Sequence, residues 1–180
     1  MAKRHRQLRT PLILFGEGPT DELFLGLFKK YYAAELADKA ITLGNGGGGS
    51  PGRILLALKK RILDMGNSSA PALALIDEDK GLDDAAKWVL KEYPNIQLVF
   101  SRPQCIDGLM LTLLDDLPPS QQRNSGMLKQ RFQDRYLGSR RKVIFHFKNS
   151  RTELFPKERL ESQKQSNPVL AEIFQFLGLP

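Results

Sequence analysis

Short hydrophobic runs recur along the chain at positions 11–15, 40–43, 71–77 and 96–101. The runs at 11–15 and 71–77 are nearly continuous rather than alternating, as in strands that are covered on both faces. The segments between the runs are amphipathic and long enough for helices. Strands that alternate with helices predict an α/β domain with a mainly parallel, Rossmann-like sheet, sandwiched by helices and with the strand after Pro11 at its centre.

The first of the expected helices has the clearest start signal. Thr20 has the character of an N-cap, and Asp21 and Glu22 follow it in the first turn, where the helix dipole favours negative charge. The apolar spacing of this segment predicts a helix that ends near Asp38. Further helices are expected over residues 54–65, 82–93, 105–117 and 167–177.

Two aromatic segments have less distinct patterns. Trp88 falls at helical spacing among apolar residues of the 82–93 segment, so it is expected in the core. In the sequence "VIFHF" at 143–147, Phe145 and Phe147 alternate with His146, which predicts a further strand near the C-terminal end of the chain. The two phenylalanines are expected either to pack in the core or to stack on bases.

Length and composition are those of a globular protein. A chain of 180 residues is long enough to form one domain with a sizeable core. No run of residues approaches the roughly 18 apolar positions of a membrane span, and the first nine residues are too basic for a signal peptide. We therefore expect a cytoplasmic protein that does not contact a membrane. The single cysteine, Cys105, and the widely separated His5 and His146 exclude a disulfide within the chain and make a zinc site improbable on ligand spacing.

The net charge of +7 is concentrated in two segments. One is the N-terminus, and the other lies between Arg123 and Arg151, where only Asp134 opposes the basic residues. Such clusters are typical of surfaces that bind a polyanion, although a solvated basic face has the same composition. The residues expected to contact nucleic acid are Arg53, Arg102, Arg140, Arg141 and Lys142.

Carboxylates stand at the ends of two expected strands. Glu17 follows the first strand, and Asp77 and Asp79 follow the third. Ligands of open α/β sheets collect outside the carboxyl ends of the strands, so these side chains are expected to converge. Like charges held that close stay ionised only with a cation between them, and ligands that are all oxygen favour Mg²⁺ or Mn²⁺. We expect Glu17 to act as general base or metal ligand, and the two aspartates as ligands.

These motifs resemble those of a Toprim domain, the fold shared by topoisomerases, bacterial primases and several nucleases. The relevant sequences are "ILFGEGPTDELFL" and "LALIDEDKG". The family carries a glutamate after its first strand and an Asp-x-Asp pair after its third, matched here by Glu17, Asp77 and Asp79. Asp21, four residues after the glutamate, resembles the arrangement in OLD-family (overcoming lysogenization defect) nucleases.

A further likeness lies in "SRPQCIDGLMLTLL". RloB-like and OLD-type proteins have an acidic residue that opens a helix after the fourth strand, and Asp107 stands at that place. Those relatives more often have glutamate followed by an aromatic residue, and here the sequence departs from that pattern. The resemblance implies that Asp21 and Asp107 are ligands for a second ion, and it covers about residues 11–116.

The resemblance implies a Toprim-like catalytic core over residues 1–117, with a basic tail at 1–10, and a basic extension at 118–180 that packs on the same domain. It also implies a nuclease of a prokaryotic defence or mobile-element system. Such proteins commonly act with an ABC-type ATPase, which would be a separate partner. The glycine-rich run at 44–53 is no P-loop, because it lacks a lysine followed by serine or threonine, so a flexible loop is expected there.

Two other functions fit the same motifs. One is a non-catalytic module that binds nucleic acid or protein through a Toprim fold. The other is a small Toprim ribonuclease that resembles the maturase of ribosomal RNA. Whether the protein is a homodimer stays open at this point.

Overall fold

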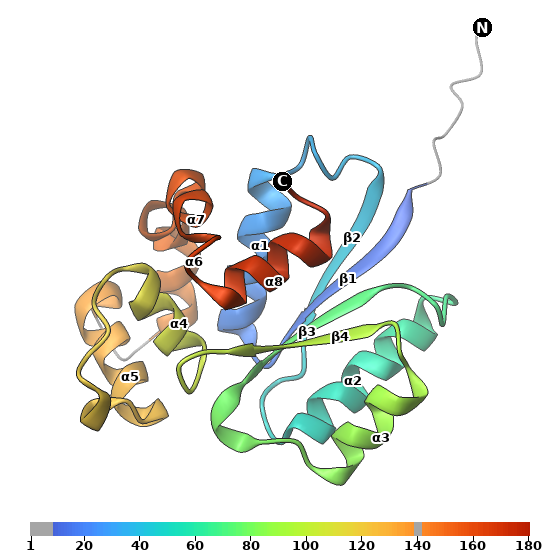
Figure 1. Cartoon of the computed structure of the whole chain (residues 1–180), viewed down its shortest axis with the longest axis horizontal. Coiled ribbons are helices and arrows are strands. Elements are labelled where there is room, and N and C mark those ends of the chain that lie inside the picture. Colours follow the sequence, from blue (N-terminus) through green and yellow to red (C-terminus); the bar gives the residue numbers. More distant parts are fainter. Residues whose placement is uncertain (1–8, 139–141) are drawn as a thin grey trace, which may run out of the picture.

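The sheet of the protein has four parallel strands in the order β2-β1-β3-β4 (Figure 1). The computed structural model describes residues 9–138 and 142–180. The strands are β1 (Thr10–Gly16), β2 (Lys39–Asn45), β3 (Ala72–Asp77) and β4 (Ile96–Ser101). The expected parallel sheet, with the strand after Pro11 in its interior, is therefore confirmed.

The strands are apolar because helices cover both faces of the sheet. Leu12 and Leu14 of β1 point into one hydrophobic cluster, and Ile13 and Phe15 point into another on the opposite face. All four side chains are buried. Successive side chains of a strand point to opposite faces of the sheet. When helices cover both faces, every side chain of the strand is buried and is therefore apolar.

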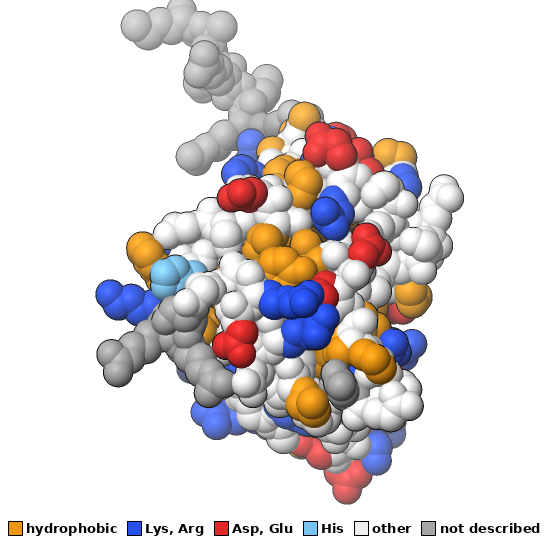
Figure 2. All heavy atoms as spheres, turned by 90° about the vertical axis from the view of Figure 1, so that its left-hand side faces the viewer, with side chains coloured by type: hydrophobic (Ala, Val, Ile, Leu, Met, Phe, Trp, Pro, Cys, Tyr) orange, Lys and Arg blue, Asp and Glu red, His pale blue; other side chains and the backbone are white. Residues whose placement is uncertain are grey.

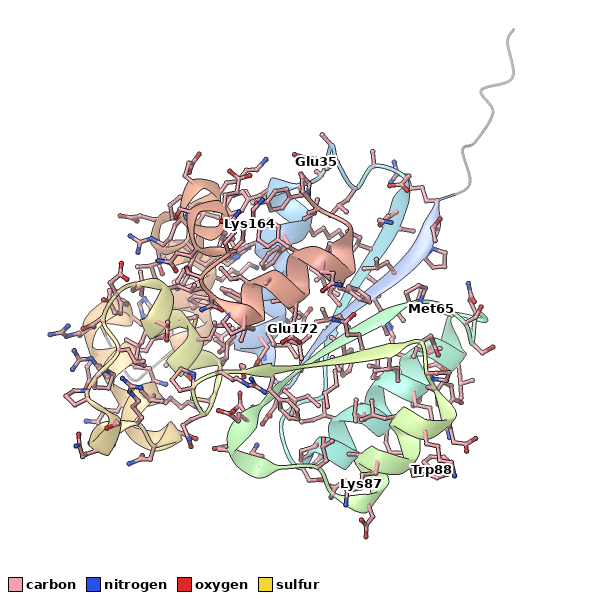
Figure 3. All side chains as sticks on the ribbon, viewed as in Figure 1. Glu35, Met65, Lys87, Trp88, Lys164 and Glu172 are labelled. Carbon is pink, nitrogen blue, oxygen red and sulfur yellow. The ribbon has the colours of Figure 1, made fainter. Side chains whose placement is uncertain are left out.

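Helices α2 (Pro51–Asp64) and α3 (Asp84–Glu92) cover one face of the sheet (Figure 1). Ile54, Leu58 and Ile62 of α2 repeat at every fourth residue and are fully buried there. The expectation for Trp88 is wrong, because its side chain lies on the outside of α3 and is 47% exposed (Figure 3). The Lys59 ammonium lies 4.3 Å from the centre of the indole ring system, a cation–π contact.

The other helices cover the opposite face of the sheet and extend beyond it (Figure 1). The α-helices of this group are α1 (Pro19–Tyr31), α4 (Ile106–Leu113), α5 (Ser125–Phe132), α6 (Val143–Leu154), α7 (Lys157–Gln163) and α8 (Pro168–Leu177). Short helices are η1 (Glu78–Lys80), η2 (Ser120–Gln122) and the π-helix η3 (Gln133–Leu137).

Aromatic contacts join the segment after residue 118 to the sheet and α1. Phe174 of α8 meets Phe28 of α1 edge to face at 5.5 Å between ring centres, and Phe155 meets Phe24 at 5.8 Å. Such pairs stabilise a core beyond the area that they bury. The two parts of the chain thus share one hydrophobic cluster.

Two further expectations about elements are wrong. Residues 143–147 begin helix α6 rather than a strand, because Val143, Phe147 and Leu154 contact the core at helical spacings of four and seven. The helix after β1 starts at Pro19 with Gly18 as its N-cap, and it ends at Tyr31. Turns follow it up to residue 38 and bury Leu36. Within the described ranges, every helix falls short of the length and apolar character that a bilayer span requires.

Candidate functional site

A cavity of about 600 Å³ opens where β1 and β3 end. Its wall includes all of the side chains that were expected to bind metal: Glu17, Asp21, Asp77, Asp79 and Asp107. The glycine-rich loop contributes Gly47 and Gly48, which both have positive φ angles, 72° and 77°, that glycine adopts without strain. Residues of α5, η3 and α6 complete the wall, so the site draws on both the expected core and the expected extension.

A close approach of α1 to the end of β1 brings Glu17 and Asp21 into this cavity. Gly16 makes that approach possible, because a Cβ atom there would lie 2.4 Å from the Cβ atom of Asp21. The backbone N–H of Gly18 then donates to Asp21 Oδ2 at 3.0 Å and satisfies one free donor at the start of the helix. Both acidic side chains are more than nine-tenths buried.

Asp21 is the most perturbed of the carboxylates. Its side chain is 3% exposed, and among the described residues its Oδ1 atom has no hydrogen-bond partner. Burial, and then the charge of Asp77, raise the pKa of Asp21 well above its usual range, although the Gly18 N–H opposes this. A buried carboxylate oxygen without a partner is costly to ionise, so it favours a bound proton or a bound cation.

Asp77 joins three elements at the edge of the cavity. Its Oδ1 atom accepts hydrogen bonds from the Ser101 hydroxyl at 2.9 Å and from the Ile106 backbone N–H at 3.0 Å. It therefore ties β3 to β4 and satisfies a donor at the start of α4, where the Cys105 side chain makes no cap. Burial, and then the charge of Glu17, raise the pKa of Asp77 to about 6.

Asp107 lies in the first turn of α4 and is also buried. Burial raises the pKa of Asp107 to about 6, and the positive charge of Lys129 partly opposes this. Lys129 lies on α5 and also lines the cavity. Nothing in the sequence close to Asp107 indicated this cation, because α5 approaches the site only through the fold.

Glu17 and Asp79 also have close partners. The Lys80 ammonium forms an ion pair with Glu17 and donates to the backbone carbonyl of Gly49 at 3.0 Å. Asp79 accepts a hydrogen bond from the Ser125 hydroxyl at the start of α5. Sequence reasoning missed both partners, although Lys80 directly follows the Asp-x-Asp pair.

The donor set and the orphaned oxygen of Asp21 fit a hard divalent cation, but the carboxylates are not arranged as a finished metal site. In residues 9–138 and 142–180, no three His, Cys, Asp or Glu side chains form a group that could hold an ion. The Lys80 ammonium occupies one oxygen of Glu17. A metal ion would therefore need Glu17 to exchange this partner and the carboxylates to draw closer.

Of the basic residues expected to contact nucleic acid, the three that the structure describes, Arg53, Arg102 and Lys142, do not line the cavity. Arg53 is exposed in the first turn of α2, just after the glycine-rich loop. Arg102 pairs with Glu78, with 3.2 Å between Nε and Oε1. Lys142 is exposed at the start of α6. The remaining two, Arg140 and Arg141, lie outside the described residues.

The basic segment between Arg123 and Arg151 is partly neutralised by Asp116, which lies outside the segment. Arg131 and Arg135 both form ion pairs with Asp116, which also accepts a hydrogen bond from the Tyr136 hydroxyl at 3.1 Å. Figure 2, which looks onto the side of the molecule where α4 to α7 lie, shows Lys and Arg side chains next to hydrophobic ones on this face.

The likeness to Toprim nucleases rests on the sequence motifs around Glu17, Asp77 and Asp79. In the structure these motifs follow two adjacent parallel strands, β1 and β3, and meet in one cavity. The fold is compatible with a Rossmann-like architecture, which hosts many unrelated functions. Comparison of the chain with protein-family models, with curated proteins and with solved structures found no match.

Proposed function

We propose that the protein is a Mg²⁺- or Mn²⁺-dependent nuclease that cleaves phosphodiester bonds in the cavity at the carboxyl ends of β1 and β3. The observation that carries the proposal is the buried Asp21, whose Oδ1 atom has no hydrogen-bond partner among the described residues and whose neighbours are acidic. Such an arrangement costs stability, and carboxylates with pKa values perturbed in this way cluster at functional sites. The carboxyl edge of a parallel sheet is also the usual ligand-binding edge.

The side chains divide into two roles. When bound, a divalent ion supplies a Lewis acid that polarises the phosphodiester and lowers the pKa of an attacking water. Asp77 and Asp79 would hold the ion, and Asp21 and Asp107 would be available for a second one. Glu17 would serve either as the base for the attacking water or as a further ligand, and both roles would require it to release Lys80.

Basic side chains near the cavity hold the substrate. Lys129 in its wall, Lys142 at the N-cap of α6 and Lys148 on α6 are suited to bind phosphates, because most affinity for nucleic acid comes from such contacts. The sequence likeness to RloB-like and OLD-type nucleases supports a role in prokaryotic defence or in a mobile element. In that setting a separate ABC-type ATPase is the partner.

A second candidate function is a non-catalytic module that binds nucleic acid through the same fold. The ion pair between Lys80 and Glu17 favours it, because an internal ammonium offsets part of the acidic charge without a metal. In this case the carboxylates serve only to position the ends of β1 and β3.

Cleavage assays distinguish the two functions. Purified protein is incubated with labelled single-stranded and duplex DNA and RNA, with Mg²⁺, Mn²⁺ or EDTA. Asp77→Asn and Glu17→Gln keep the size of each side chain and remove its charge, so each is expected to abolish cleavage and leave binding intact. Asp84→Asn, which removes an exposed charge on α3, is the matched control and should cleave as the wild type does.

Cleavage that survives both substitutions would show that other residues carry the chemistry. A wild-type protein that binds metal but never cleaves, even with its ATPase partner, would favour the binding module. Loss of binding together with cleavage would indicate a folding defect, which circular dichroism detects.

A further inference from the structure

Phe145 is the most exposed large hydrophobic side chain among the described residues, at 60%. It lies in the first turn of α6, directly after Val143 and Ile144, which line the acidic cavity. Phe147, two residues later, is fully buried and meets Phe132 edge to face at 5.9 Å. The start of α6 thus buries Phe147 in the core and exposes Phe145 to solvent, next in sequence to Ile144 of the cavity wall.

Positive charge flanks this aromatic ring. Lys148 lies three residues after Phe145 on α6, so these two side chains project from the same side of the helix. Lys142, the N-cap residue of α6, lies three residues before Phe145 in the sequence. Both lysines are exposed. An aromatic ring between two cations is the arrangement that holds a nucleotide strand, with a base on the ring and phosphates on either side.

The wall of the cavity is also partly apolar. Pro19, Ile106, Val143 and Ile144 contribute to it, next to the carboxylates. A phosphate group gains nothing from such a surface, whereas the sugar and base of a nucleotide bury apolar area against it. The volume of about 600 Å³ lies within the range of sites that enclose small ligands, about 300–1,000 Å³.

We infer that Phe145 stacks on an unpaired base, and that the cavity takes single-stranded or locally unpaired nucleic acid. In a duplex both faces of each internal base are covered by its neighbours, so an aromatic side chain can stack only where a base is unstacked or at an end. Lys142 and Lys148 bind the phosphates that flank this base. The inference deepens the proposed nuclease function and rests on it, since it names the strandedness of the substrate.

Binding measured with EDTA present tests the inference independently of cleavage. Fluorescence anisotropy compares a labelled oligothymidylate with a blunt-ended DNA duplex of equal length. Phe145→Ala is expected to weaken binding of the single strand by about fivefold to 100-fold, which is the usual contribution of one stacked base. Its effect on the duplex should be less than twofold, and Phe145→Tyr should restore affinity for the single strand.

Leu63→Ala is the matched control, because Leu63 is similarly exposed, at 49%, and lies on α2, which covers the other face of the sheet. This variant should bind both oligonucleotides as the wild type does. A direct readout comes from Phe145→Trp in a Trp88→Phe background, where the only tryptophan reports on position 145. Its emission should be quenched by the oligothymidylate and unaffected by the duplex.

Each outcome decides between the two proposals. Unchanged single-strand binding in Phe145→Ala, an equal loss for single strand and duplex, or no binding of nucleic acid at all overturns the inference. If Phe145→Ala cleaves and binds as the wild type does, the nuclease proposal stands alone. If single strands bind through Phe145 but the wild type never cleaves, the stacking inference stands and the nuclease proposal fails.

Discussion

Replacing Asp21 by asparagine is expected to stabilise the protein when metal ions are removed with EDTA. The asparagine carbonyl can accept the hydrogen bond from Gly18 that Asp21 Oδ2 now accepts. Its amide group then takes the place of Oδ1, which has no partner among the described residues. The charges of Asp77 and Glu17, which disfavour a carboxylate at this position, favour an amide N–H.

The size of the effect has an upper bound. The wild-type protein folds at pH 7 either by burying a charged carboxylate or by keeping it protonated. Protonation at pH 7 of a group whose ordinary pKa is about 3.9 costs about 4 kcal/mol, because each pH unit corresponds to about 1.4 kcal/mol. Asp21→Asn avoids this cost, but burying the polar amide group of asparagine itself costs about 1–2 kcal/mol. A stabilisation of about 1–3 kcal/mol at pH 7 is therefore expected.

The gain should depend on pH with a definite sign. The pKa of Asp21 is raised by folding, so the folded wild-type protein retains a proton that the unfolded chain releases above about pH 4. Wild-type stability accordingly falls as the pH rises from about 4 toward 7, and Asp21→Asn removes this loss. The stabilisation by Asp21→Asn should grow as the pH rises from about 4 to 7 and be absent below about pH 4.

Urea denaturation followed by circular dichroism measures this difference in EDTA at several pH values. Asp84→Asn, whose side chain is fully exposed, should change the free energy of unfolding by less than about 0.5 kcal/mol. An Asp21→Asn protein that is less stable than the wild type at pH 7 would refute the reasoning, because Asp21 would then be a structural residue. Adding Mn²⁺ should raise the melting temperature of the wild type more than that of Asp21→Asn.

Three other perturbations test separate parts of the structure. Gly16→Ala places a Cβ atom 2.4 Å from the nearest side-chain atom and should cost about 1–3 kcal/mol in urea denaturation, while Gly126→Ala, whose nearest contact is 3.4 Å, should be neutral or slightly stabilising. Lys80→Met removes the ammonium from Glu17 and should raise affinity for Mn²⁺ in calorimetry by about fivefold, because a partly exposed ion pair contributes up to about 1 kcal/mol; weaker binding would mean that Lys80 supports the site. Partial burial acts to raise the pKa of Asp116, but hydrogen bonds from two arginines and a tyrosine outweigh it and lower the pKa. Asp116→Asn should therefore cost about 1 kcal/mol at pH 7, and the cost should vanish as the pH falls through that lowered pKa; a cost that persists in acid would exclude the charge as its cause.

The sheet could be predicted from the sequence because its strands are covered on both faces. Leu12 to Phe15 form a continuous apolar run, and the parallel pairing follows from strands that alternate with helices. The prediction of secondary structure failed where the apolar residues of a short segment fit both the two-residue period of a strand and the 3.6-residue period of a helix. Phe145 and Phe147 are two residues apart, as in a strand, but only Phe147 contacts the core. Trp88 is large and apolar, yet it lies on the face of α3 opposite the buried Ala86 and Val89.

The acidic residues of the cavity could be anticipated because they follow adjacent parallel strands. Glu17 and Asp77 come at the ends of β1 and β3, whose carboxyl ends necessarily share one edge of the sheet. Their partners depend on tertiary contacts that no local pattern encodes. Ser125 reaches Asp79 from 46 residues away, and Lys80 turns back onto Glu17 across 63 residues.

The sequence predicted an acidic core up to residue 117 and a basic extension after it. In the structure, residues from both parts line the same cavity and share one hydrophobic cluster. Ser125 and Lys129 of α5, and Val143 of α6, form part of the cavity wall together with Glu17 and Asp77. The same helices fill the core against α1 and are held in place by aromatic contacts rather than by a linker. A substrate that binds in the cavity would therefore contact α5 and the start of α6 as well as the carboxylates. If the proposed nuclease function is correct, strand binding and metal binding share this surface, and substitutions on α6 should change substrate choice without any change to an acidic residue.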